Sequence, residues 1–158
     1  RTDQAARLGA RGLSLQRSTG LKLLSSVNIW ILATAYAAAG DHDRALAVLD
    51  EADELMGSFG EKLMQPALML CRAQVILEAD GESAAEKLML ESLQLAHDRQ
   101  DGWHKLHAAM ALARLWRGEG KHREARELLA PVYGWFTEGL DTAPLLEARA
   151  LLDELESV

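Results

Sequence analysis

The chain of 158 residues has little of what several protein classes require. Its single cysteine, Cys71, can form no internal disulfide and is compatible with a reducing compartment. No apolar run approaches the roughly 20 residues that a membrane-spanning helix needs, and there is no signal-peptide pattern. The net charge of −7 disfavours non-specific binding to nucleic acid. Together, these absences predict a cytoplasmic protein that binds neither membranes nor nucleic acid.

Aromatic residues and proline are also scarce. Only 5% of the residues are aromatic and only three are proline, whereas Ala and Leu dominate. Ala and Leu favour helices, while strands favour aromatic and β-branched residues. The composition therefore predicts an all-α fold, and the length suits one domain with a sizeable core.

The strongest pattern is a spacing of 40 residues between alanines. One series is Ala33, Ala73 and Ala113, and the other is Ala5, Ala45, Ala85 and Ala125. A fixed period of this size predicts a stack of helical hairpins. Small residues allow the two helices of a hairpin to approach closely, and large apolar residues three or four positions away fill the space around the contact.

This spacing divides the chain into elements, which we treat as one domain over residues 1–158. We expect an unpaired helix over 3–17, three repeats over 20–57, 60–99 and 102–137, and a capping helix over 142–156. The first helix is expected to pack through Ala5, Leu8, Gly12, Leu13 and Leu15. Because no preceding helix would cover it, we expect either a longer chain or an interface with a second copy.

The ends of the helices follow from breakers in the sequence. Gly40 and Gly120 hold the same position in two hairpin turns, and Asp80 stands there in the middle hairpin. We expect residues 56–60 to form a turn. Asp153 falls where a further repeat would need a small residue, so the last helix is interpreted as a cap and not as a new repeat.

At these positions the chain resembles the tetratricopeptide repeat (TPR). That repeat places small residues at its eighth and twentieth positions, a bulky residue at the eleventh and Gly near the fifteenth. The matching residues are Ala33, Tyr36, Gly40 and Ala45, and then Ala113, Trp116, Gly120 and Ala125. The resemblance implies a right-handed superhelical stack of hairpins, an α-solenoid, with repeats longer than the usual 34 residues.

The last third is similar to the carboxyl terminus of a bacterial family. The similarity covers residues 112–117, Ala125-Arg126, residues 129–139 and Asp141-Thr142. In that family, a class III adenylate/guanylate cyclase domain or a winged-helix DNA-binding domain precedes an AAA-type ATPase and a TPR array. The catalytic motifs belong to those other domains. The resemblance therefore implies a regulatory tail without an activity of its own.

Three groups of residues are candidates for sites of chemistry. Gly118-Glu119-Gly120-Lys121 resembles the end of a phosphate loop, but Leu115 and His122 stand where the full motif needs Gly and Ser or Thr. His97, His104 and His107 lie close together but lack further ligands at a usual spacing for a metal. Cys71 has apolar neighbours that favour a core position. We therefore predict no catalytic, cofactor-binding or metal-binding residues.

TPR stacks bind partners along the concave face that their first helices line. The repeat numbering places eight residues there: Trp30, Thr34, Leu70, Gln74, Glu78, Met110, Arg114 and Arg117. Trp30 and Met110 could anchor a partner, and the two arginines could receive a carboxylate. The leading hypothesis is a non-catalytic interaction or regulatory module whose partner is a protein or peptide, including upstream domains of the same polypeptide. The alternatives are a homo-oligomerisation scaffold that uses helix 3–17, and an enzyme.

Overall fold

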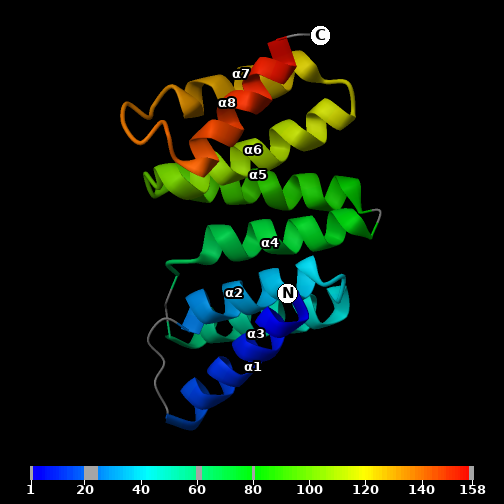
Figure 1. Cartoon of the computed structure of the whole chain (residues 1–158), viewed down its shortest axis with the longest axis vertical. Coiled ribbons are helices and arrows are strands. Elements are labelled where there is room, and N and C mark those ends of the chain that lie inside the picture. Colours follow the sequence, from blue (N-terminus) through cyan, green and yellow to red (C-terminus); the bar gives the residue numbers. More distant parts are fainter. Residues whose placement is uncertain (1, 20–24, 60–61, 80, 157–158) are drawn as a thin grey trace. The chain divides into compact units, whose positions relative to one another are not determined.

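The structure, a computed structural model, describes residues 2–19, 25–59, 62–79 and 81–156. Over these ranges it contains helices and no strand, as the composition predicted (Figure 1). The eight helices described are α1 (Thr2–Thr19), α2 (Ser25–Ala38), α3 (His42–Phe59), α4 (Gln65–Glu78), α5 (Glu82–Asp98), α6 (Gly102–Gly118), α7 (His122–Tyr133) and α8 (Ala143–Glu156).

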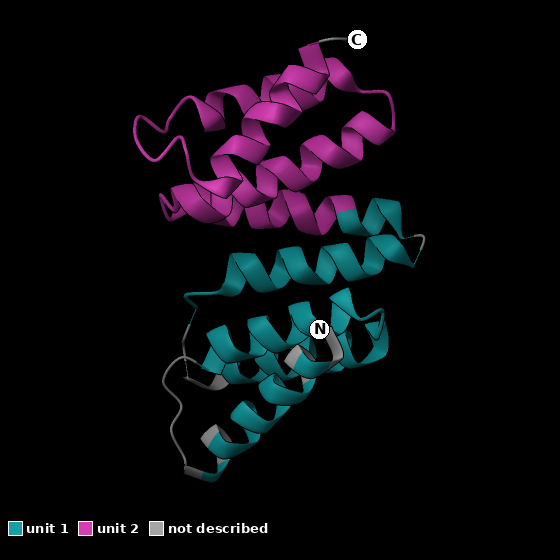
Figure 2. Cartoon of the chain, in the orientation of Figure 1, with its two compact units in different colours: residues 1–85 teal, residues 86–158 magenta. Residues whose placement is uncertain are grey.

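The chain divides into two compact units, residues 1–85 and residues 86–158 (Figure 2). In unit 1, α2 packs against α1 and α3, and α4 contacts both α2 and α3. In unit 2, α6 and α7 form an antiparallel pair and α8 packs against both of them (Figure 1). Each unit has a hydrophobic core of its own.

The described alanines with the 40-residue spacing are buried. Six members of the two series have no exposed side-chain surface: Ala33, Ala45, Ala73, Ala85, Ala113 and Ala125. The large residues that follow on the second helices, Leu49, Met89 and Leu129, are also buried. The 40-residue spacing therefore identified core positions correctly, because a side chain larger than a methyl group would separate two closely packed helices.

The hairpin turns use glycine for a conformational reason. Gly40 and Gly120 have φ values of +74° and +78°, which side chains with a Cβ atom rarely adopt. The next residue then donates its N–H back to the helix it has left, over 3.0 Å from Asp41 to the Tyr36 carbonyl and 2.8 Å from Lys121 to the Trp116 carbonyl. In the middle hairpin Gly81 makes the equivalent bond to the Ile76 carbonyl, over 3.1 Å, while Asp80 lies outside the described residues.

Two local expectations were wrong. Residues 56–59 do not form a turn, because α3 continues to Phe59 and Met56 is buried in the core of unit 1. Burying a side chain of this size contributes about 1.5–3 kcal/mol, which exceeds the cost of about 1 kcal/mol for Gly57 inside a helix. The helix therefore continues through the glycine until its core contact is complete.

The packed side of α1 also differs from the expected one. Leu13 is buried, but Leu8 and Leu15 are 61% and 59% exposed, and nothing lies within 4 Å of a Cβ placed on Gly12. Instead Gly9 faces α2, where an added Cβ would lie 3.1 Å from Leu32 Cδ1. The helix has two apolar sides, and the close approach at Gly9 selects one of them. The side chain of Ala5 lies outside the described residues.

Candidate functional site

In unit 1, the predicted face lies on α2 and α4. Trp30 is half-buried against the core of the unit, and Thr34 is exposed one turn later on α2. The Thr34 hydroxyl donates to the Trp30 carbonyl over 2.8 Å and lies 3.9 Å from Cys71 Sγ on α4. Burial raises the pKa of the Cys71 thiol, against smaller opposing effects of Thr34 and Arg72, so the group stays protonated at neutral pH.

The α4 part of this face changes from apolar to acidic along the helix. Leu70 is half-buried, whereas Gln74 and Glu78 are exposed. The Glu78 carboxylate lies 2.6 Å from His42 Nε2 at the start of α3. Because α2 and α4 contact each other, the structure brings all five predicted residues of unit 1 onto one helix pair.

A double ion pair fixes α4 against α3 in the same unit. Arg72 donates to Asp50 and to Asp53, each over 2.8 Å, and its own side chain is 21% exposed. The two aspartates are one turn apart on α3, so one guanidinium fork reaches both. This clamp was not predicted from the sequence, because the partners are 19 and 22 residues from Arg72 and share no motif with it.

In unit 2, the three predicted residues on α6 differ in their exposure. Met110 is 1% exposed and belongs to the core cluster that also contains Leu145 and Leu151 of α8. Arg114 and Arg117 reach α8 as well, where Arg114 donates to Glu147 over 3.1 Å and Arg117 donates to Glu154. The last helix therefore supplies carboxylates to both arginines, and Met110 lies beneath the surface.

The three histidines do not form one site. His104 Nδ1 lies 2.5 Å from Asp101, whose carboxylate also accepts the His104 backbone N–H as the cap of α6. His97 instead accepts a hydrogen bond from Lys105. Burial alone would raise the pKa of Asp101, but its bonds from His104 outweigh burial and lower it. Within the described ranges, no three His, Cys, Asp or Glu side chains are grouped so as to hold a metal ion.

His107 is expected to make the protein less stable in mild acid. Burial lowers the pKa of His107, as do the charges of His104 and Arg114, against an opposing effect of Glu147. The unfolded chain then binds more protons at this residue than the folded chain below a pH of about 6.5. The free energy of unfolding should fall as the pH drops from about 7 through this range. His107→Gln should reduce that slope in urea titrations, and an unchanged slope would contradict the assignment.

The phosphate-loop resemblance lies in the turn between α6 and α7. Gly120 has the positive φ that closes the turn, and Lys121 Nζ lies 2.6 Å from Glu119. The hydrogen bond that Lys121 donates to the Glu119 carboxylate raises the pKa of Lys121. This lysine is paired within its own turn, and the glycines are explained by the geometry of the hairpin.

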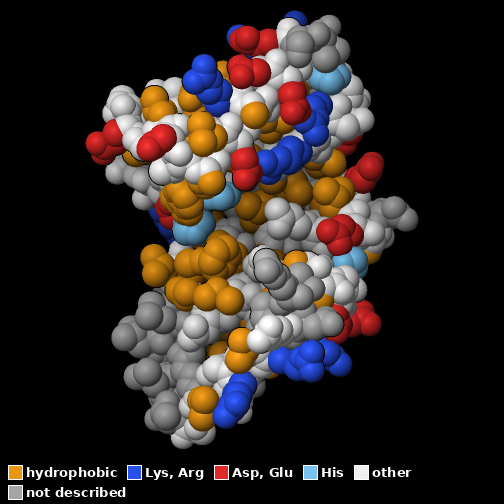
Figure 3. Space-filling model, viewed as in Figure 1, with side chains coloured by type: hydrophobic (Ala, Val, Ile, Leu, Met, Phe, Trp, Pro, Cys, Tyr) orange, Lys and Arg blue, Asp and Glu red, His pale blue; other side chains and the backbone are white. Residues whose placement is uncertain are grey.

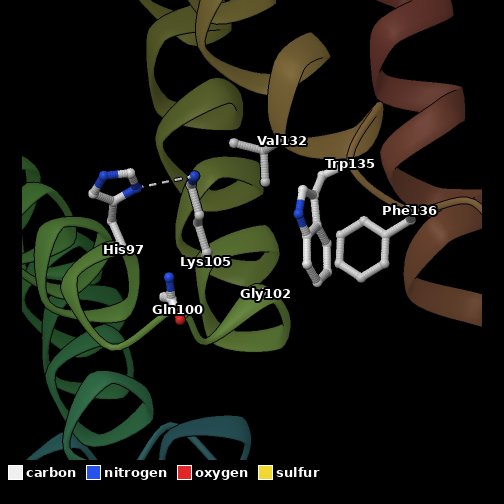
Figure 4. Close-up of a pocket in the computed structure, with 7 residues that line it drawn as sticks. All are labelled: His97, Gln100, Gly102, Lys105, Val132, Trp135 and Phe136. Atoms are coloured by element: carbon white, nitrogen blue, oxygen red, sulfur yellow. Dashed lines mark hydrogen bonds between the residues drawn. The ribbon is translucent and has the colours of Figure 1, made fainter.

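Unit 2 also contains a pocket that the sequence argument did not predict. It lies where the end of α5, the start of α6 and the end of α7 meet, and its volume is about 510 Å³ (Figure 4). Its lining residues are His97, Gln100, Gly102, Lys105, Val132, Trp135 and Phe136. Trp135 and Phe136 follow the end of α7, within residues 129–139. No sequence signal indicated this pocket, because its residues come from separate helices and share no motif.

No protein-family model and no curated protein matches the chain. Its fold is similar to two crystal structures from Podosopora anserina of a "putative kinesin light chain" with nearly identical TPR-like repeats. The first has a TM-score of 0.69 and 20% sequence identity, and the match covers 99% of this chain and 77% of that protein's chain. The other has a TM-score of 0.67 at 20% identity, covering 99% and 78%. The fold is therefore an all-α, TPR-like stack of helical hairpins.

A TPR-like fold is typical of modules that bind other proteins, because stacked hairpins present extended faces of side chains. The predicted TPR resemblance is thus confirmed at the level of fold. Among the helices that the structure describes, none is long and apolar enough to cross a bilayer.

Proposed function

We propose that the chain is a non-catalytic module that binds a protein or peptide, and that the face of α2 and α4 in unit 1 receives it. The supporting observation is the arrangement of Trp30 and Leu70, two half-buried apolar side chains, beside the exposed Thr34 and Gln74. Figure 3 shows hydrophobic side chains gathered over the first turns of these two helices. A rigid aromatic anchor with a polar rim is the usual composition of a binding hot spot.

Within unit 2, we propose a separate binding surface at the two arginines of α6. Their side chains are 47% and 40% exposed although each is paired with a glutamate of α8. Exposed ion pairs contribute only about 0–1 kcal/mol, so a carboxylate from a partner could exchange with Glu147 or Glu154 at little cost. Met110, being buried, would support this surface from below.

A peptide selection tests the proposal and requires no named partner. Peptides displayed on phage are selected against the intact chain, and the affinity of each winner is measured by calorimetry. Gln74→Arg, on the proposed face, should weaken binding about tenfold or more, through a lost contact of about 1.4 kcal/mol. Gln94→Arg is the matched control, since Gln94 is an exposed glutamine on α5. The proposed face would be wrong if the two substitutions weakened the binding of the selected peptides equally, or if neither weakened it.

We further propose that the module is the carboxyl-terminal TPR region of a bacterial cyclase–ATPase signalling protein in the cytoplasm. The support is the tail over residues 129–139 and the TPR-like fold. Contact of the module with its own ATPase domain, or with a separate protein, would bias the activity of the effector domain. Coding sequence upstream of Arg1 that specifies a phosphate-loop ATPase and a cyclase or winged-helix domain is expected. In that protein, regulation unchanged by deletion of residues 1–158 would refute the proposal.

The second candidate function is assembly through α1. Leu8, Gly12 and Leu15 lie on one side of this helix, both leucines are largely exposed, and Gly12 would allow close approach of another helix. A second copy of the chain could cover this side. Light scattering over a range of concentrations should then show a dimer that Leu8→Glu dissociates. A monomer at every concentration would exclude this function.

A further inference from the structure

The pocket of unit 2 has one polar end. Lys105 lies in it and donates a hydrogen bond of 3.1 Å to His97 Nδ1 (Figure 4). A lysine ammonium carries three donors, so two of them remain for a ligand. The nearest acidic residues along the chain are already engaged, because Asp101 binds His104 and Asp98 accepts from Gln94 over 2.7 Å. Within the described ranges, no carboxylate lies at ion-pair distance from Lys105.

The other end of the pocket is aromatic and held in place. Trp135 lies directly on Gly102, where an added Cβ would come within 2.6 Å of the indole Cζ3 atom. Phe136 meets the indole edge to face, with 5.2 Å between ring centroids and a 90° angle between planes. These two contacts fix the ring although Trp135 is 68% exposed. Figure 4 shows the nitrogen-bearing edge of the indole turned toward the Lys105 side of the pocket.

We propose that this pocket binds a peptide segment in which an acidic side chain lies beside an apolar one. The carboxylate would accept from Lys105 and from the indole N–H, and the apolar side chain would pack between Trp135 and Val132. Two convergent donors, one of them charged, favour an anionic acceptor over a neutral one. Trp is one of the residue types that are enriched among hot spots of protein interfaces, together with Tyr and Arg.

The exposure of Trp135 also favours a peptide over a small metabolite. Pockets for small molecules bury about 70–90% of their ligand, whereas Trp135 is 68% exposed and much of its indole faces open solvent. A peptide can leave such a wall partly open, because the rest of its chain continues over the neighbouring surface. The pocket shares no residue with the surface proposed above on α2 and α4, or with the one proposed on α6, so each proposal can fail without the others.

The experiment uses the intact chain labelled with nitrogen-15, in which the indole N–H resonance of Trp135 reports on the pocket. The probe is an array of acetylated, amidated octapeptides that pair Asp or Glu with Phe or Leu at separations of one to three residues. Each has a counterpart in which Asn or Gln replaces the acid. The best acidic peptides should shift the Trp135 resonance and bind about tenfold more tightly than their amide counterparts.

Three variants make the result specific. Lys105→Met should lower the affinity of the acidic peptides to that of their amide counterparts. Lys87 is an exposed lysine on α5, and Lys87→Met should leave the affinity of both kinds of peptide unchanged. Gly102→Ala should displace the indole and weaken both kinds of peptide, while circular dichroism remains unchanged. The proposal is overturned if no peptide shifts the Trp135 resonance, or if amides bind as well as acids. Equal affinity for free 3-phenylpropionate would also overturn it, in favour of a small aromatic acid.

Discussion

Leu151→Asp should detach α8 from unit 2. Leu151 is 4% exposed and belongs to the same core cluster as Met110, Ala113 and Leu129. The change removes a buried side chain and leaves a carboxylate in an apolar core without a designed partner. The lost apolar contacts and the buried carboxylate would together cost more than about 4 kcal/mol. We therefore expect α8 to dissociate from α6 and α7, because this exposes the carboxylate to water. Protection of the α8 amides against hydrogen exchange should fall to the level of an unfolded segment.

Leu146→Asp is the control for this prediction. Leu146 is on the same helix and receives the same charge, but its side chain is 50% exposed. Surface substitutions of this kind change stability by less than about 0.5 kcal/mol, so α8 should keep its protection. Equal losses in the two variants would mean that charge or helix propensity, and not burial against α6 and α7, holds α8 in place.

The 40-residue period was sufficient to predict the fold because two independent features of the sequence indicate the same hairpins. Two series of alanines, 40 residues apart, mark positions where helices approach closely, and the described members of both series are fully buried. Gly40 and Gly120 mark the turns for a separate reason, their positive φ. Packing and backbone conformation thus point to the same hairpins, and neither depends on contacts that are distant in sequence.

Details that depend on tertiary contacts were not predictable in this way. On α1, two apolar sides compete, and the close contact of Gly9 with Leu32 decides which one faces α2. The helical continuation through Gly57 is likewise decided by the burial of Met56. Both outcomes depend on which residues of other helices lie nearby in the folded structure. A periodic pattern on one helix does not carry this information.

The candidate face illustrates the same limit. Repeat numbering assigned Met110, Arg114 and Arg117 to one surface, and the structure separates them by depth. Helical spacing fixes direction around the helix axis but not whether a neighbouring helix covers that direction. Here α8 buries Met110 and supplies Glu147 and Glu154 to the arginines. The pocket beside Trp135 was missed for a related reason, because its lining residues come from three helices and from the segments that follow α5 and α7.

Ala113→Leu should be among the most damaging single changes in unit 2. Ala113 has no exposed surface and lies in the core cluster with Ala125 and Leu129. Three additional carbon atoms at a close helix contact must displace α6 from its neighbours, at a cost of about 3 kcal/mol. Hydrogen exchange measured on peptides from α6 and α7 would report this loss separately from unit 1.

Two further substitutions identify the cause of that loss. Ala150→Leu adds the same atoms at an exposed position of α8 and should change stability by less than about 0.5 kcal/mol. Ala113→Gly keeps the contact open and should cost only about 1 kcal/mol, the difference in helix propensity. Glycine should therefore be tolerated better than leucine at position 113. The reverse order would mean that this alanine serves helix formation and not close packing, and the 40-residue series would lose its physical basis.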